Sequence, residues 1–228
     1  MSRAVIRIFP LFLGLVLLLA AAPQQARAES DTQQLVTKAQ WSLNEMLADP
    51  DFASLARTLP EARAVMIFPS ILKAAFIFGA EGGNGVLLAR GAAGDWSYPA
   101  FYTLGAASFG LQIGGEEQEV VLLIMNDAAL DAIMRSEVKL GADLSVAAGP
   151  VGVGIEGSTT TAVGGDIVAY SRSQGLFAGL SVEGAVIHER EGYAQEYYGT
   201  SASVSQIVID RAVSNGGADS LRSTLAGY

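Results

Sequence analysis

The chain of 228 residues contains no cysteine and only one histidine, His188. The lack of cysteine excludes disulfide bonds, thiolate metal sites and cysteine nucleophiles. It also excludes a lipoprotein, because the N-terminal leader has no cysteine to acylate. One histidine argues against a zinc site, which normally takes three or four protein ligands, and no G-x-S-x-G elbow supplies the serine of a catalytic triad. No enzymatic activity, cofactor or metal is expected.

Basic residues are also scarce, with 14 Lys and Arg against 23 Asp and Glu. The first 28 residues hold three arginines and no acid, so the net charge of −9 for the whole chain becomes about −12 (14 − 3 basic against 23 acidic residues) if they are removed. A strongly acidic protein repels nucleic acid, and on average also anionic membranes. No nucleic-acid partner is expected.

The N-terminus has the pattern of a targeting signal. Arg3 and Arg7 precede an apolar run over residues 8–22, and Ala26-Arg27-Ala28 matches a small-x-small cleavage site. The sequence therefore predicts a signal peptide over residues 1–28, a single domain over residues 29–228, and a periplasmic or secreted protein. An uncleaved membrane anchor is the alternative, although the apolar run is short for a span and is interrupted by Pro10.

The sequence after the leader predicts a helix over residues 32–48, or about 31–48 with its cap Asp31. Its apolar residues recur at helical spacing, and Asp49-Pro50 ends it before a short helix over residues 51–57. The apolar face, which includes Leu43, either packs on the rest of the domain or lies in a membrane interface. In the second case Trp41 sits at headgroup depth and Lys38 is the single cation of the polar face.

From residue 64 onward, short apolar runs alternate with glycine-rich turns, including residues 82–85. Strands are predicted at 64–68, 74–79, 86–90, 98–104, 108–113, 120–125, 138–147, 160–171, 176–188 and 193–198. Glycine within the strand-like segments 104–115 and 175–183 indicates bends or close backbone approaches. The run 120–125 is apolar throughout, as in a central strand buried on both faces.

Helical patterns cover residues 127–134 and 203–213, the second with Ser203 as cap and Asn215-Gly216 as stop, and the tail beyond is expected to fray. Gly149-Pro150-Val151-Gly152-Val153-Gly154 is interpreted as a turn and not a phosphate loop, because no helix follows it. The predicted fold is α+β, with a strongly bent antiparallel sheet or partly closed β-barrel flanked by N- and C-terminal helices.

Several segments resemble the SYLF domain, and they occur in the order typical of that family. They are IFPSILKAAFIFG (67–79), GVLLAR (85–90), DWSYP (95–99), SFGLQIG (108–114), VVLLIMN (120–126), LGADLSVAAGPVG (140–152), YSRSQGLFAGLSVEGAV (170–186) and YYG (197–199). The resemblance implies a non-enzymatic lipid-binding domain. Eukaryotic members bind phosphoinositides through an N-terminal amphipathic helix and basic residues, and some fungal members bind actin.

The resemblance implies that Lys73 contacts a lipid headgroup, and Arg90 matches the basic residue that ends the following strand of the family. Our hypothesis is peripheral membrane binding, in which the 32–48 helix inserts apolar residues while Lys73 and Arg63 contact a phosphate. The expected partner is a phospholipid or membrane surface. Actin is not expected in the compartment to which the leader directs the chain. The alternative is an envelope module that binds another protein.

Overall fold

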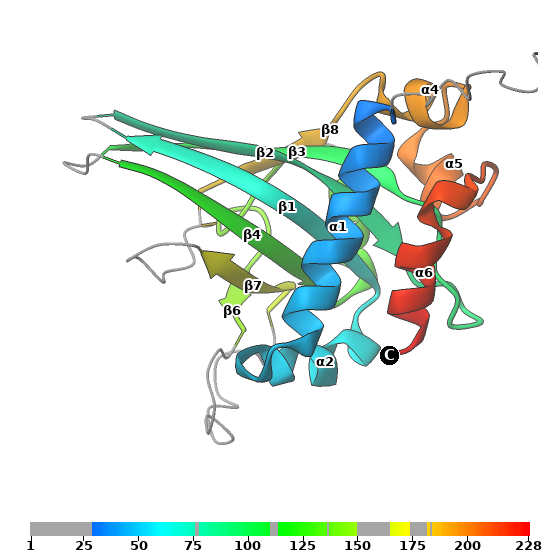
Figure 1. Ribbon diagram of the computed structural model, residues 1–228, viewed down its shortest axis with the longest axis horizontal. Coiled ribbons are helices and arrows are strands. Elements are labelled where there is room, and N and C mark those ends of the chain that lie inside the picture. Colours follow the sequence, from blue (N-terminus) through cyan, green and yellow to red (C-terminus); the bar gives the residue numbers. More distant parts are fainter. Residues whose placement is uncertain are drawn as a thin grey trace, which may run out of the picture.

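The computed structural model describes residues 29–75, 78–109, 114–135, 137–149, 165–173, 182 and 184–228. The leader, residues 150–164 and residues 174–181 lie outside this set, as do the predictions made for them. The elements, in chain order (Figure 1), are α1 (Asp31–Ala48), η1 (Pro50–Phe52), α2 (Ala53–Thr58), η2 (Leu59–Glu61), β1 (Ala64–Ala75), β2 (Phe78–Ala89), β3 (Ala100–Phe109), β4 (Gly114–Ile124), α3 (Asp127–Arg135), β5 (Val138–Lys139), β6 (Val146–Ala148), β7 (Ile167–Ser173), β8 (Val186–Glu189), α4 (Tyr193–Tyr198), α5 (Val204–Val208), η3 (Gly216–Ala218) and α6 (Asp219–Ala226).

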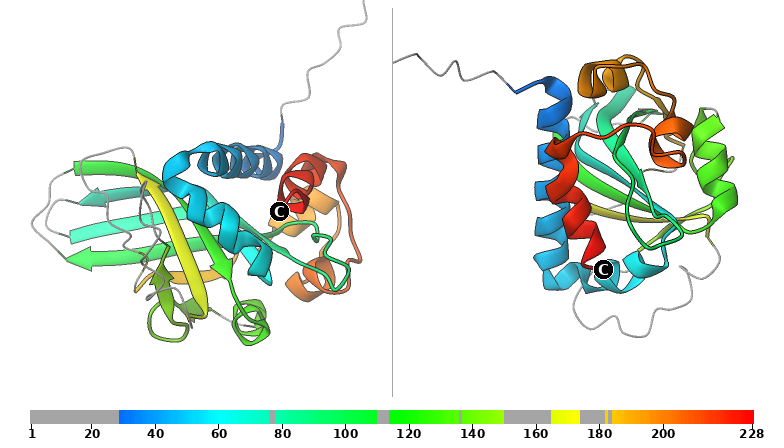
Figure 2. Two further views of the ribbon diagram at one scale, coloured as in Figure 1. Left: turned by 90° about the horizontal axis from the view of Figure 1, so that it is seen from below. Right: turned by 90° about the vertical axis from the view of Figure 1, so that its right-hand side faces the viewer.

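The strands form one sheet in the order β5-β8-β3-β2-β1-β4-β7-β6. Neighbouring strands are antiparallel except β6 and β7, which are parallel. The sheet curls into a half-barrel with helices from both ends of the chain packed on it (Figures 1 and 2). The predicted α+β class with a strongly bent sheet is confirmed.

Both faces of the sheet are buried over its helical end, because alternate residues of each strand point to opposite sides. On one side, which we call the α1 face, strand residues such as Val65, Ile67 and Leu123 pack with α1, α2 and α6. On the other side, the α3 face, residues such as Met66 and Leu122 pack with α3 and α5. Figure 2 shows α1 and α6 side by side on the first face and α3 on the opposite side. The predicted central strand is confirmed, since β4 is fully buried from Val120 to Ile124.

The strands before residue 125 are fewer and longer than predicted. The predicted break between residues 68 and 74 is a register shift within β1, and the predicted turn at residues 82–85 lies inside β2. Glycine in this part of β2 lets the backbone of β1 approach closely. A side-chain carbon added to Gly83 would lie 2.2 Å from the Ser70 carbonyl oxygen. Turn-forming residues thus accommodate close packing within long, curled strands.

The C-terminal region differs more from the prediction. Residues 193–198, predicted as a strand, form α4, which begins after Gly192 and ends before Gly199, both in the left-handed region. Helix α5 starts at the predicted Ser203 cap but ends at Val208, and Asn215 caps η3 instead of stopping a helix. The tail predicted to fray forms α6, because Leu221 and Leu225 are fully buried. Within the described residues, no helix has both the length and the hydropathy of a membrane span.

Candidate functional site

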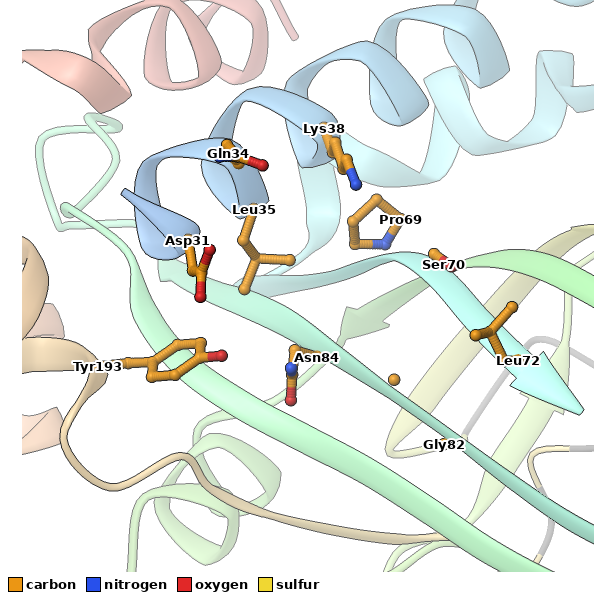
Figure 3. A pocket seen from close by; sticks show the side chains of 11 residues that line it. Asp31, Gln34, Leu35, Lys38, Pro69, Ser70, Leu72, Gly82, Asn84 and Tyr193 are labelled. Atoms are coloured by element: carbon orange, nitrogen blue, oxygen red, sulfur yellow. The ribbon is translucent and has the colours of Figure 1, made fainter. Parts of the chain in front are cut away.

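A groove of about 400 Å³ lies between the first half of α1 and the part of the sheet formed by the second half of β1 and the first half of β2 (Figure 3). Its walls come from segments far apart in the sequence. They are Asp31, Gln34, Leu35 and Lys38 of α1, Pro69, Ser70 and Leu72 of β1, Gly82, Gly83 and Asn84 of β2, and Tyr193 of α4. The groove therefore exists only in the folded domain.

The two flanks of α1 have different surroundings. On one flank Gln33 donates to the Gly217 carbonyl at 3.0 Å, and Thr224 of α6 donates to Asn44 at 3.0 Å. The other flank carries the groove residues and faces the uncovered part of the sheet (Figures 1 and 3). Farther along this flank, Glu45 forms an ion pair with Arg172 of β7. Contacts with η3 and α6 on one flank and with β7 on the other hold α1 in place, and the groove stays open beside the first half of the helix.

Helix α1 and strand β1 together expose one cation and two large apolar side chains near the groove. Lys38 is exposed, and within the residues that the structure describes it forms no ion pair or hydrogen bond. Trp41, one turn farther along α1, is 61% exposed, and Leu72 of β1 is 62% exposed. These two are the most exposed large apolar side chains among the described residues. Exposed apolar groups beside an unpaired cation are typical of interfacial surfaces.

Of the predicted site residues, only Lys38 lines the groove. Trp41 is exposed three residues farther along α1 and is not a lining residue. Lys73 lies 3.9 Å from Glu81, and its side chain is 24% exposed. It points to the α3 face, because the register shift in β1 directs Ile71 and Lys73 to that side and Leu72 to the other. Lys73 thus has an acidic partner away from the groove.

Arg63 and Arg90 are held at the opposite end of β1. Arg63 donates to Asp127 at 2.7 Å. Arg90 donates to the carbonyls of Leu59 and Ala62 and stacks on Trp96 at 4.4 Å. Burial and the nearby Arg63 lower the pKa of Arg90.

This arrangement contradicts the predicted joint phosphate contact of Lys73 and Arg63. The two residues are separated by almost the whole of β1, roughly 30 Å at 3.3 Å per residue. One phosphate group cannot reach both. Arg90 lies at the same end of the sheet as Arg63 and is likewise distant from the groove.

The placement of Leu43 is a second correction to the sequence-based site. Its side chain is fully buried between α1 and the α1 face of the sheet. Apolar residues at helical spacing can face either the core of the domain or a membrane. Here they pack against Val65, Ile67 and their neighbours in the sheet. Leu43 is thus a core residue in this structure and is not presented to a lipid surface, in agreement with the alternative interpretation of the helix.

The groove residues of β1, β2 and α4 were not identified from the sequence. Their recruitment depends on strand register and on the position of α4, neither of which is local in sequence. One signal was available for Leu72, since it directly precedes Lys73 and alternates with Ile71 and Lys73 along the strand. Across the described part of the chain, no group of three or more His, Asp or Glu side chains is arranged to hold a metal ion.

Comparison with known proteins agrees with the resemblance seen in the sequence. Residues 105–228 match the family model Ysc84, described as Las17-binding protein actin regulator. Similar proteins include the SH3 domain-containing YSC84-like protein 1 of Homo sapiens (33% identical over 65% of this chain and 44% of the relative) and Protein YSC84 of Saccharomyces cerevisiae (35% over 67% and 33%). A third is the SH3 domain-containing protein PJ696.02 of Schizosaccharomyces pombe (34% over 72% and 38%).

The chain thus spans less than half the length of the curated relatives it matches. The descriptions of the family and of its members name binding and regulation and do not name a reaction. More than half of the chain matches the family model, and the match includes β4, the central strand of the fold. The chain therefore belongs to the Ysc84 (SYLF) family.

Proposed function

We propose that the protein is a non-enzymatic, peripheral phospholipid-binding protein whose membrane face is the open flank of α1 and the adjoining part of β1. The observation that carries the proposal is that Lys38 and the exposed Leu72 line the groove, and that the exposed Trp41 follows Lys38 by three residues on α1. Trp41 would occupy the headgroup region, Leu72 would insert beside it, and Lys38 would contact a phosphate. Helix α1 remains packed on the sheet throughout.

The exposed apolar area supports weak, reversible adsorption. Burial of about 150 Å² of the Trp41 and Leu72 surfaces contributes about 4 kcal/mol at 25 cal/mol per Å², equivalent to roughly millimolar affinity. A lysine near an anionic surface adds about 1 kcal/mol, and physiological salt screens this within about 8 Å. The net charge, −9 for the whole chain and about −12 without the leader, opposes adsorption to strongly anionic bilayers. Apolar contact therefore supplies most of the binding.

We further propose that the protein is exported and acts at a membrane outside the cytoplasm. Support comes from the leader sequence over residues 1–28, with its basic start, apolar run and small residues at 26 and 28. Immunodetection in periplasmic and cytoplasmic fractions tests this. The protein should appear in the periplasmic fraction, shortened by the 28 residues of the leader. Recovery of the full-length chain in the cytoplasm would contradict it.

Vesicle co-sedimentation tests the membrane face with matched variants. Trp41→Ser and Lys38→Glu are expected to reduce binding severalfold. Ile209→Ser removes another exposed apolar side chain, at 50% exposure, and Lys139→Glu makes the same charge change at the exposed Lys139 of β5. Both controls should bind like the unaltered protein. Equal losses in the test and control variants, or no binding to any vesicle, would contradict the proposal.

The second candidate function is protein binding, favoured by the family description, which names a binding partner, Las17, for other members. For this chain it takes the form of an envelope module with a protein partner. Affinity capture from detergent-free and delipidated extracts distinguishes the two functions. A partner retained after lipid removal, and retained by Trp41→Ser, would favour protein binding over the membrane function.

A further inference from the structure

We propose that the groove recognises the zwitterionic headgroup of an ethanolamine phospholipid, with the phosphate at Lys38 and the ammonium at Asp31. The inference rests on the proposed membrane function and names the lipid class that the groove selects. It is carried by the charges, the ring orientation and the glycine floor of the groove.

The groove presents one group of each sign. Asp31 and Lys38 are both exposed and both line it, and within the described residues neither forms an ion pair. They are two helical turns apart on the same flank of α1, about 10 Å along the axis. Figure 3 shows Asp31 on the side of Tyr193 and Lys38 beside Pro69, with Leu35 between them. The flexible stem of Lys38 can shorten this separation to suit a compact zwitterion.

Tyr193 favours a primary ammonium over a choline group. Arg190 lies over the Tyr193 ring at 5.0 Å, and Phe101 contacts the ring edge-on at 5.7 Å. The ring is therefore already engaged by protein groups, whereas a quaternary ammonium is usually held by several free aromatic faces. The Tyr193 hydroxyl points into the groove toward Asn84 (Figure 3). An ethanolamine ammonium, with three N–H donors, could donate to Asp31 and to this hydroxyl.

Gly82 forms part of the floor of the groove, and the packing around it does not require glycine at this position. A side-chain carbon added to Gly82 would have only the Leu104 carbonyl oxygen near it, at an ordinary 3.5 Å. By contrast, glycine is required at the adjacent position 83, because a side chain there would collide with the Ser70 carbonyl oxygen. Glycine in a strand interior weakens the strand, and it often marks a place where a ligand or another backbone approaches closely. At Gly82 the open space belongs to the groove, so a headgroup can approach the strand directly.

The overall charge is consistent with a zwitterionic ligand. With a net charge of −9, or about −12 without the leader, the protein is repelled by anionic bilayers but not by neutral ones. A site with one acid and one base retains its attraction for a neutral headgroup on such a surface. The proposal therefore predicts stronger binding to phosphatidylethanolamine-containing vesicles than to pure phosphatidylcholine.

The test compares phosphatidylcholine vesicles with and without phosphatidylethanolamine, using the whole protein and four variants. Asp31→Asn should lower affinity for the mixed vesicles about tenfold, the loss expected for one charge-assisted hydrogen bond, and leave binding to pure phosphatidylcholine unchanged. Gly82→Val, which fills the floor, should also abolish the preference. Gly105→Val is the matched control, because Gly105 pairs directly with Gly82 and does not line the groove. Lys139→Glu controls for charge.

A soluble competitor separates headgroup recognition from changes in bilayer packing. Glycerophosphoethanolamine should shift the backbone amide resonances of Gly82 and Asn84, and glycerophosphocholine should not. A preference that survives Asp31→Asn and Gly82→Val, or equal binding to both vesicle types, would overturn the headgroup assignment while leaving membrane binding intact. Absence of binding to every vesicle would instead remove the proposed function on which the assignment rests.

Discussion

Replacing Leu43 with alanine tests whether α1 is part of the core or a releasable membrane anchor. The side chain is fully buried, so the substitution removes the equivalent of three methylene groups, about 2.4 kcal/mol at about 0.8 kcal/mol each. The cavity left behind raises the cost to about 3 kcal/mol. With a urea slope of about 2 kcal/mol per molar, the unfolding midpoint should fall by about 1.5 M.

The assay is urea unfolding followed by circular dichroism, with Trp41→Ala as the control on the same helix. Trp41 is largely exposed, and its truncation should change the free energy of unfolding by no more than about 0.5 kcal/mol. The urea slope should be the same in both variants. Equal small effects for the two substitutions would refute the packing of α1 described above and restore insertion of its apolar face as a mechanism.

Two further predictions concern other parts of the domain. Hydrogen bonds from the Ser145 side chain, from Asn126 and from the Ser145 backbone hold the pKa of Asp166 below its usual range. The stability from this carboxylate is therefore present above about pH 4 and lost as the pH falls through the lowered pKa, so Asp166→Asn should flatten the acid side of the stability profile. If stability fell with acidification as steeply in Asp166→Asn as in the unaltered protein, this role of Asp166 would be contradicted. Leu225→Ala should lower the free energy of unfolding by about 2–4 kcal/mol in urea titrations, because α6 is a core helix, whereas a frayed tail would show no change.

Sequence patterns predicted the elements whose determinants are local. Helix α1 was placed within one residue at its start, since apolar spacing and Asp49-Pro50 mark it, although Ser30 is the cap and not Asp31. The central strand β4 followed from an unbroken apolar run. Helix α4 was missed because its aromatic residues favour strands in isolation. In the structure Phe101 contacts the Tyr197 ring, and glycines with positive φ bound the helix.

The candidate site was predictable only in part, for the same reason. Lys38 and Trp41 follow from the polar side of one helix. The exposure of Leu72 and the pairing of Lys73 with Glu81 depend on a register shift that no local pattern reveals. The groove joins residues near positions 31, 70, 83 and 193, and bringing these together requires the complete sheet.

The fluorescence of Trp41 during vesicle binding tests the proposed membrane face most directly. The chain has two tryptophans, and Trp96 is buried while Trp41 is exposed, so a change in solvent contact reports on Trp41. Vesicles containing phosphatidylethanolamine should shift the emission to shorter wavelength, and lipids brominated near the headgroup should quench it. Sedimentation with vesicles without either change in Trp41 emission would contradict the account.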